Sequence, residues 1–185
     1  MTPALALVHT LDSAAVRALA SAVGRCPPFD RAAVATADHL AKLHVALLGL
    51  LYLGSFVRGR SHRFGLAVRM SAALGVTIGA VHVIGRCVVR ARPFARHDGV
   101  TALIEHGSHR SFPSRHAACA ATMAAVAAPT APILGTLLGV TGVLLGVSRV
   151  YAGLHYPSDV VGGWLVGTAV GRLVRLEWWR LEWQR

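Results

Sequence analysis

The chain has 185 residues, enough for a single domain, and 54% of them are hydrophobic while only 15% are charged. With a mean hydropathy of +0.53, this balance favours a protein with several membrane spans over a soluble globular protein. The 19 basic residues outnumber the 8 acidic ones, which suits contact with phosphate groups. The apolar runs leave little room for a soluble basic face, so nucleic acid is not expected as a partner.

The N-terminal segment, residues 1–30, lacks the charged-then-apolar order of a cleaved signal peptide. It instead resembles an amphipathic helix that lies on the membrane surface. Its composition leaves open whether this segment lies on the membrane or spans it.

Five apolar segments follow along the chain, and each is close to the length needed to cross a bilayer. One uncharged run is too long for a single span and is divided by Pro129 and Pro132. The segments are Leu43–Val57, Phe64–Gly85, the two halves of Ala117–Ser148, and Pro157 to about Val174. The first is expected to begin some residues before Leu43, despite Asp38 and Lys42. Residues 172–185, with tryptophans among arginines, are predicted to form an interfacial tail. The sequence therefore predicts an all-α polytopic membrane bundle of five to six transmembrane helices, in one domain that covers residues 1–185.

Two polar connections, 86–114 and 149–156, lie on the same side of the membrane if the helices alternate in direction. Several of their arginines are candidates for a phosphate site. When these arginines are left out of the positive-inside count, the remaining basic residues place the C-terminus in the cytoplasm and the two connections outside.

The shorter connection carries a histidine and an aspartate at a specific spacing. Pro157 suits the first position of a helix, so Asp159 lies in the first turn and can reach back to His155. An aspartate bonded to one imidazole nitrogen fixes the tautomer and leaves the other nitrogen free as a nucleophile.

The longer connection ends at Pro113, which is predicted to open a second helix. Ser114, Arg115 and His116 then occupy its first turn, where free backbone N–H groups bind anions. Two histidines and several arginines around a helix N-terminus suit phosphoryl transfer. Arginines neutralise the transition state, one histidine attacks phosphorus and the other protonates the leaving oxygen.

No metal or other cofactor is expected for this chemistry. The acidic residues form no cluster typical of a Mg²⁺ site, and the long loop's His97, His106 and His109 lack a clear fourth zinc ligand. The three cysteines, Cys26, Cys87 and Cys119, form no C-x-x-C pair, so neither a zinc ribbon nor a disulfide framework is predicted.

Three ordered blocks, "RCVVRARPF" from Arg86, "PSRH" from Pro113 and "SRVYAGLHYPSD" from Ser148, carry a family resemblance. They resemble the tripartite signature of the type 2 phosphatidic acid phosphatase (PAP2) superfamily, which reads K-x6-R-P, P-S-G-H and S-R-x5-H-x3-D. The likeness covers roughly residues 85–159, and the surrounding helices fit the membrane bundle of that family.

This resemblance implies a role for each matching residue. His155 is the nucleophile that forms a phosphohistidine, Asp159 orients it, and His116 is the general acid. The residues implied to bind the substrate phosphate are Arg92, Ser114 and Arg149, together with the backbone amides of the first helical turn.

Two positions depart from the family pattern. Gly85 stands where the first block has a lysine, and either Arg86 or Arg90 is expected to replace that phosphate contact. Arg115 stands where the second block has a glycine, and an added guanidinium group there suits a diphosphate substrate.

Within the superfamily, the small size and the "RARPF" and "SFPSRHA" stretches are most like the bacitracin-resistance type of undecaprenyl diphosphatase. The implied reaction removes the terminal phosphate of undecaprenyl diphosphate at the outer, periplasmic face of the bacterial inner membrane. It regenerates the lipid carrier for cell-wall synthesis.

Other functions stay open at this point. The substrate could be a phospholipid, which would make the protein a phosphatidic acid or phosphatidylglycerol phosphate phosphatase. The loss of the lysine keeps a non-catalytic binder or transporter of phospholipids possible. A vanadium haloperoxidase shares the signature, but such enzymes are soluble and the apolar spans argue against it. The sequence does not indicate an oligomeric state.

Overall fold

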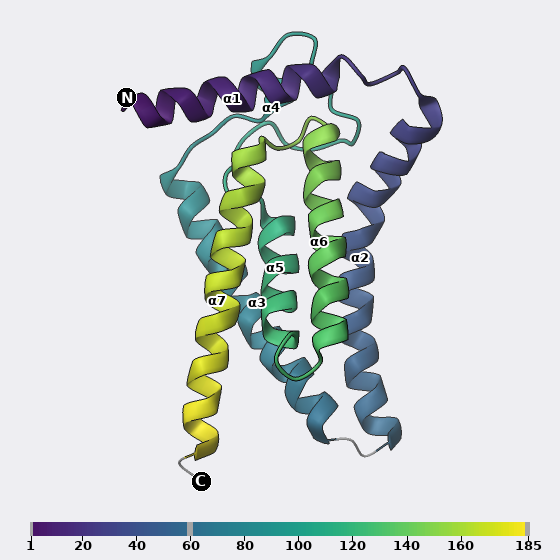
Figure 1. Ribbon diagram of the computed structural model, residues 1–185, viewed down its shortest axis with the longest axis vertical. Coiled ribbons are helices and arrows are strands. Elements are labelled where there is room, and N and C mark those ends of the chain that lie inside the picture. Colours follow the sequence, from purple (N-terminus) through teal and green to yellow (C-terminus); the bar gives the residue numbers. More distant parts are fainter. Residues whose placement is uncertain (1, 59–60, 184–185) are drawn as a thin grey trace.

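The computed structural model describes residues 2–58 and 61–183, and these residues form helices and connections without a strand. The helices are α1 (Pro3–Ala20), α2 (Pro27–Arg58), α3 (Ser61–Cys87), α4 (Pro93–Arg96), α5 (Arg115–Ala127), α6 (Pro132–Tyr151) and α7 (Pro157–Trp183). Five of them, α2, α3, α5, α6 and α7, run along the long axis of the molecule, and α1 lies across one end (Figure 1). The all-α membrane bundle predicted from the sequence is confirmed.

Three helices in the described part of the chain are long and apolar enough to cross a membrane. They are Pro27–Phe56, His62–Cys87 and Pro132–Tyr151. As expected, α2 begins before Leu43, and its start at Pro27 lies well upstream of it; α7 continues beyond Val174 to Trp183. The side chains of the predicted interfacial tail beyond residue 175 lie outside the described residues.

The short helix α5 is the centre of the bundle and packs against α3, α6 and α7. Its contact with α7 is close because glycines of α7 face it. A Cβ atom at Gly167 would lie 2.0 Å from the backbone oxygen of Ala118, and one at Gly163 would lie 2.5 Å from that of Ser114. Small residues at helix contacts allow such approach in membrane bundles. This packing fixes the start of α5 beside the start of α7.

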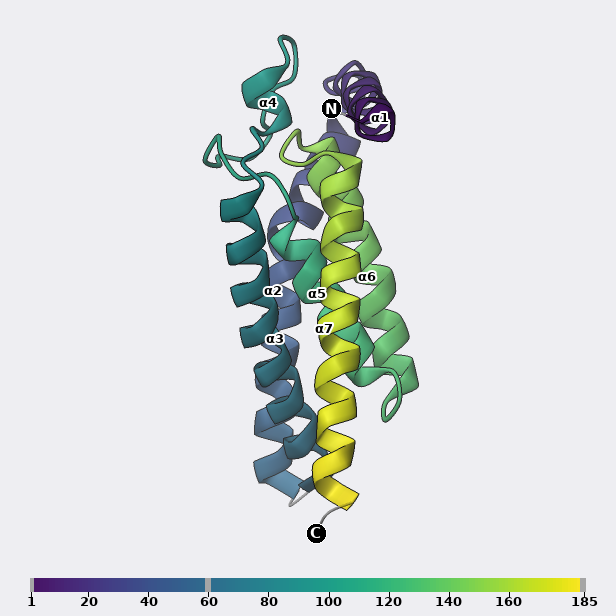
Figure 2. The ribbon, with the colours of Figure 1, turned by 90° about the vertical axis from the view of Figure 1, so that its left-hand side faces the viewer.

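The polar connections gather at one end of the bundle. The 88–114 connection, the 152–156 connection and α1 all cap this end, whereas the turn at Pro129 lies at the other (Figures 1 and 2). Beneath α1, Val16 packs in a buried cluster with Val100, Ala117, Val150 and Val160. The prediction that the two signature-bearing connections share one face of the molecule is therefore confirmed.

Candidate active site

His155 lies in the tight connection between α6 and α7. The chain turns at Gly153, which has a φ of +72°, and a Cβ atom there would lie 2.8 Å from the backbone oxygen of Thr101. Glycine meets both demands, since it has no side chain and readily adopts positive φ. His155 is thereby held in a fixed place and is only 3% exposed.

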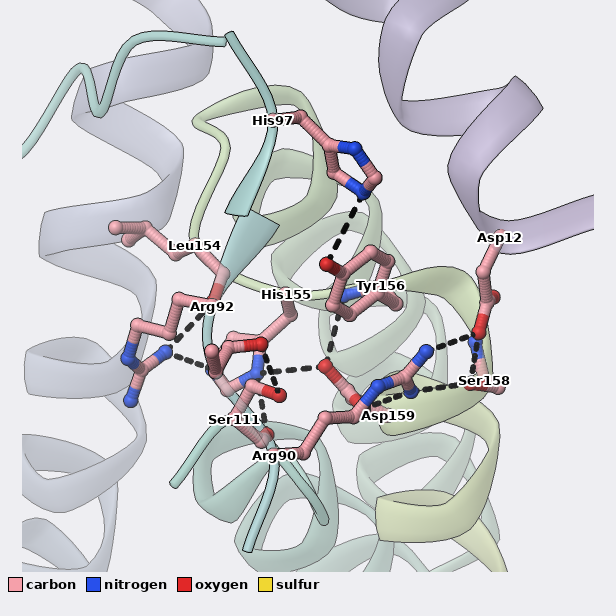
Figure 3. Close-up of polar contacts among 11 residues, drawn as sticks. Asp12, Arg90, Arg92, His97, Ser111, Leu154, His155, Tyr156, Ser158 and Asp159 are labelled. Atoms are coloured by element: carbon pink, nitrogen blue, oxygen red, sulfur yellow. Dashed lines mark hydrogen bonds and ion pairs between the residues drawn. The ribbon is translucent and has the colours of Figure 1, made fainter. Parts of the chain in front are cut away.

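The hydrogen bonds of His155 define its tautomer (Figure 3). Its Nδ1 lies 2.8 Å from the backbone oxygen of Ser111. A carbonyl oxygen only accepts hydrogen bonds, so Nδ1 carries the proton and donates it. Nε2 then holds the lone pair, which is the state that a nucleophilic imidazole requires.

Asp159 lies beside the same ring nitrogen of His155, Nδ1. The carboxylate is fully buried, and its Oδ2 lies 3.7 Å from Nδ1 of His155. Oδ2 also accepts a hydrogen bond of 2.8 Å from the backbone N–H of Tyr156. Asp159 thus reaches back from the first turn of α7 as the spacing predicts, and it shares Nδ1 with the Ser111 carbonyl oxygen.

Burial lowers the pKa of His155 below its ordinary value of 6.5. The positive charges of Arg92 and Arg149 act in the same direction, while Asp159 opposes them. Burial disfavours the charged imidazolium and has the largest effect, so His155 is neutral at neutral pH.

Arg92 lies directly against Nε2 of His155. Its Nη1 donates to the backbone oxygen of Leu154 at 2.7 Å and to Nε2 of His155 at 3.2 Å. Arg92 immediately precedes Pro93, the first residue of α4, so the Arg-Pro pair of the first sequence block sets its position. The guanidinium group and the imidazole are both buried, which holds their geometry.

Several buried donors near His155 have no partner within the protein. Among the side chains that the structure describes, the buried nitrogen and oxygen atoms without a hydrogen bond are Nε of Arg90, Nε of Arg92, Nε and Nη2 of Arg149, and Oγ of Ser114. Buried polar atoms are normally paired. Arg92 donates to His155, Ser114 N bonds to the Asp159 carbonyl oxygen at 2.9 Å, and the Arg149 carbonyl oxygen accepts the N–H of Leu154 at 3.1 Å. The unpaired donors of these three residues therefore belong to the surroundings of the connection that carries His155. They suit a tetrahedral oxyanion such as phosphate.

A cavity of about 240 Å³ opens beside this group. Its lining includes Ile78, Val81, His82, Gly85, Arg92, His106, His109, Arg110, Phe112, Pro113, Arg115, His116 and His155. His116, in the first turn of α5, thus lines the same cavity as His155, as the sequence predicts. Partial burial, together with the charges of Arg92 and Arg149, lowers the pKa of His106 to about 4.

The two candidates for the missing lysine lie in different surroundings. Arg90 binds carboxylates: its Nη1 donates to Asp159 at 2.6 Å and its Nη2 donates to Asp12 at 2.6 Å. Arg86 is exposed at the end of α3, with Nη1 3.3 Å from Nε2 of His82. Gly85 lines the cavity, but neither arginine is among its lining residues. A role for Arg86 in phosphate binding stays a prediction.

Sequence reasoning missed Asp12 and Ser111. Ser111 contributes its backbone oxygen, and no side-chain pattern reveals such a contact. Asp12 is buried on α1 and bonds to Arg90 and to the start of α7. It is the only acidic residue before Asp30. A single acid in this otherwise apolar and basic segment is the feature of the sequence that could have indicated a specific partner.

Comparison with known proteins gives one family and two similar solved structures. A family model described as the PAP2 superfamily matches residues 66–183. The crystal structure of Aquifex aeolicus LpxE is 26% identical over 86% of this chain and 91% of that one, with a TM-score of 0.69. The first transmembrane PAP2 type phosphatidylglycerolphosphate phosphatase from Bacillus subtilis is 26% identical over 94% and 86%, with a TM-score of 0.68. None of the curated proteins compared with the sequence matches it.

Proposed function

The chain belongs to the PAP2 superfamily, whose members are phosphatases, and we propose that it removes the terminal phosphate of undecaprenyl diphosphate or a similar polyprenyl diphosphate through a phosphohistidine. The observation that carries this proposal is the set of unpaired buried donors of Arg92, Arg149 and Ser114 beside His155, whose Nε2 carries no proton. Donors without partners beside a preset nucleophile are what an in-line attack on phosphorus needs.

In the proposed first step, the unpaired donors of Arg92, Arg149 and Ser114 bind the non-bridging oxygens of the terminal phosphate. The lone pair of His155 Nε2 forms a bond to phosphorus while the bond from phosphorus to the leaving oxygen breaks. Burial and the charge of Arg149 lower the pKa of His116 to about 3 in the free protein, so the negative charge of the bound substrate is needed to raise it again. His116 then acts as imidazolium and gives its proton to that oxygen. Undecaprenyl phosphate leaves and the phosphohistidine remains.

In the proposed second step, His116 is neutral and accepts a proton from a water molecule. The water oxygen bonds to phosphorus as the P–N bond breaks, which releases inorganic phosphate and returns both histidines to their starting states. Phosphorylation of Nε2 leaves a positively charged ring, and Asp159 together with the Ser111 carbonyl oxygen supports this charge at Nδ1.

A diphosphate substrate is supported by the excess of cationic and basic groups around the cavity. Beyond Arg92, which contacts His155, the lining includes His106, His109, Arg110 and Arg115. One phosphate does not need all of these groups, whereas a second phosphate places further negative charge within reach of them. Arg115, which replaces the glycine of the family pattern, is the clearest candidate for the added contact.

A second candidate substrate is the phosphomonoester of a glycerophospholipid. The similarity to the Bacillus subtilis structure, which is described as a phosphatidylglycerolphosphate phosphatase, favours it. For either substrate we propose the bacterial inner membrane as the location, with the cavity facing the periplasm or outside, because the basic residues away from the site then lie in the cytoplasm.

The test is phosphate release by purified protein in detergent with EDTA present. Undecaprenyl diphosphate, phosphatidic acid and phosphatidylglycerol phosphate are offered separately. We expect the isoprenoid diphosphate to be preferred and His155→Ala to lower its turnover on the order of 10³-fold or more. Arg115→Gly, which restores the family residue, should reduce the preference for diphosphate over monophosphate about tenfold.

Each other outcome points to a different function. Preference for a glycerophospholipid, lost in His155→Ala, would keep the mechanism and replace the substrate. Phosphate release that survives in His155→Ala would contradict the phosphohistidine mechanism. No release from any of the three lipids would favour a non-catalytic phospholipid binder.

A further inference from the structure

Asp12 is a buried carboxylate on a helix that carries none of the family's signature residues. Asp12 and Val16 are the buried residues of α1, and they lie one helical turn apart on the face toward the bundle. Leu5, Leu7 and Leu11 are more than half exposed elsewhere on the helix. A carboxylate that is only 3% exposed is costly unless it is paired and hydrogen-bonded. The partners of Asp12 therefore indicate what this buried carboxylate does.

Those partners lie at the first turn of α7 and on the 88–114 connection (Figure 3). Asp12 Oδ1 accepts the backbone N–H of Ser158 at 3.0 Å, and Oδ2 accepts the hydroxyl of Ser158. Oδ2 also accepts Nη2 of Arg90 at 2.6 Å. Asp12 thus binds the N-terminus of α7 one residue before Asp159, where a negative charge is favoured.

Arg90 connects the two carboxylates. Its Nη1 donates to Asp159 Oδ1 at 2.6 Å while Nη2 donates to Asp12. The guanidinium carbon lies 3.9 Å from the centre of the Tyr156 ring, a cation–π contact that fixes its plane. With Oδ1 of Asp159 held by Arg90, the other oxygen is turned toward Nδ1 of His155.

The charges of this chain of contacts matter for the reaction. Asp12, Arg90 and Asp159 together carry one net negative charge, and it lies beside the imidazole that becomes positively charged on phosphorylation. Without Asp12, the full charge of Arg90 would act on Asp159 alone and would reduce the support that Asp159 gives to the ring.

We propose that Asp12 is a positioning residue for the histidine nucleophile, and that through Arg90 it makes the docking of α1 a requirement for full activity. This inference rests on the proposed phosphohistidine mechanism. Asp12 contacts neither the cavity nor His155, so its effect is on the rate of phosphoryl transfer rather than on substrate binding.

The first test compares steady-state kinetics of Asp12→Asn and Asp12→Glu with those of the wild type. Asp12→Asn keeps the shape and removes the charge, and we expect kcat to fall about tenfold with KM within about twofold of the wild type. Asp12→Glu restores the charge and should recover most of kcat. The matched control is Asp98→Asn, an exposed acid on the loop after α4, which should behave as the wild type.

Two results would overturn the proposal. One is a wild-type kcat in Asp12→Asn. The other is a loss that Asp12→Glu does not recover and that equals the fall in folded protein, which would make Asp12 merely structural. If Asp12→Asn does not fold, Ser158→Ala serves instead. It removes the hydroxyl group shared by Asp12 and Arg90, and kcat should fall about threefold; an unchanged kcat would count against the proposal.

A second measurement does not depend on turnover. In protein labelled with ¹⁵N-histidine, the Nδ1–H signal of His155 is assigned by its loss in His155→Ala. Asp12→Asn should move this proton signal upfield, because Arg90 then acts on Asp159 alone and the Asp159 carboxylate attracts the proton less. An unchanged signal would overturn the role of Asp12. If the wild type releases no phosphate from any lipid, the proposed function fails, and this signal still decides whether Asp12 positions His155.

Discussion

At the scale of single residues, the contact between Arg92 and His155 bears on both the resting protein and the proposed reaction. In the resting protein, Nη1 of Arg92 donates to the lone pair of Nε2 at 3.2 Å. In the proposed mechanism, that lone pair must be released before it can attack phosphorus. A phosphate group that enters the cavity offers Arg92 stronger, charge-assisted hydrogen bonds. Substrate binding then frees the nucleophile at the moment when its target is in place.

The lowered pKa of His155 predicts the pH dependence of the reaction. Burial and the charges of Arg92 and Arg149 outweigh Asp159, so the free imidazole persists as the pH falls through 6.5. We expect kcat/KM, measured between about pH 4 and 8, to show the protonation of His155 only below pH 6.5.

The lowered pKa of His155 also affects the stability of the fold. Below pH 6.5 the unfolded chain binds a proton at this histidine more readily than the folded protein does, so the free energy of unfolding should decrease as the pH drops through this range. A limb of the kcat/KM profile assigned to His155 that lies above pH 6.5 would mean that Asp159 dominates over burial.

Residue spacing predicted the histidines of the site and the aspartate that supports one of them, because each lies within a turn of a helix start. It could not decide between Arg86 and Arg90, since the direction of a long side chain depends on partners that are distant in sequence. Arg90 binds Asp12, 78 residues away. Asp12 was missed because an acid in an amphipathic helix is usually solvent-exposed.

At the scale of the helices, the glycines of α7 allow the contact that positions the site. Gly167→Ala would place a methyl group against the backbone of Ala118, and we expect it to destabilise the protein by about 1–3 kcal/mol. Gly79→Ala on α3 is the matched control, since nothing lies within 4 Å of the added atom. Thermal unfolding in detergent measures both. Equal unfolding temperatures for the two variants would contradict the close packing of α5 and α7.

The helix boundaries show why apolar runs underestimate some membrane helices. The first apolar run is expected to begin some residues before Leu43, and α2 begins at Pro27. It carries Asp38 and Lys42 one turn apart, with 2.7 Å between the charged atoms. This pair makes the segment polar in sequence while keeping it helical. The division at Pro129 was predictable because two prolines within four residues strongly disfavour a continuous helix, and the second of them suits the first position of the next helix.

At the scale of the whole molecule, two native cysteines allow the proposed orientation to be tested. Cys26 precedes α2 and Cys87 ends α3, and both are exposed at the end of the bundle that holds the cavity. A membrane-impermeant maleimide should therefore label intact spheroplasts, and the Cys26→Ser/Cys87→Ser double variant should lose the label. Labelling of the wild type only after the membrane is disrupted would place the cavity in the cytoplasm.

The unpaired donors of Arg92, Arg149 and Ser114 also have a meaning for the energetics of folding. A buried donor without an acceptor is a cost to the folded state, and an anion that binds there removes this cost. Phosphate bound there, as proposed, is linked to folding as well as to catalysis, because a ligand that binds only the folded protein stabilises it increasingly as its free concentration exceeds its Kd. The released product satisfies the same donors as the substrate. The donors that bind the substrate tightly should therefore also make free phosphate an inhibitor.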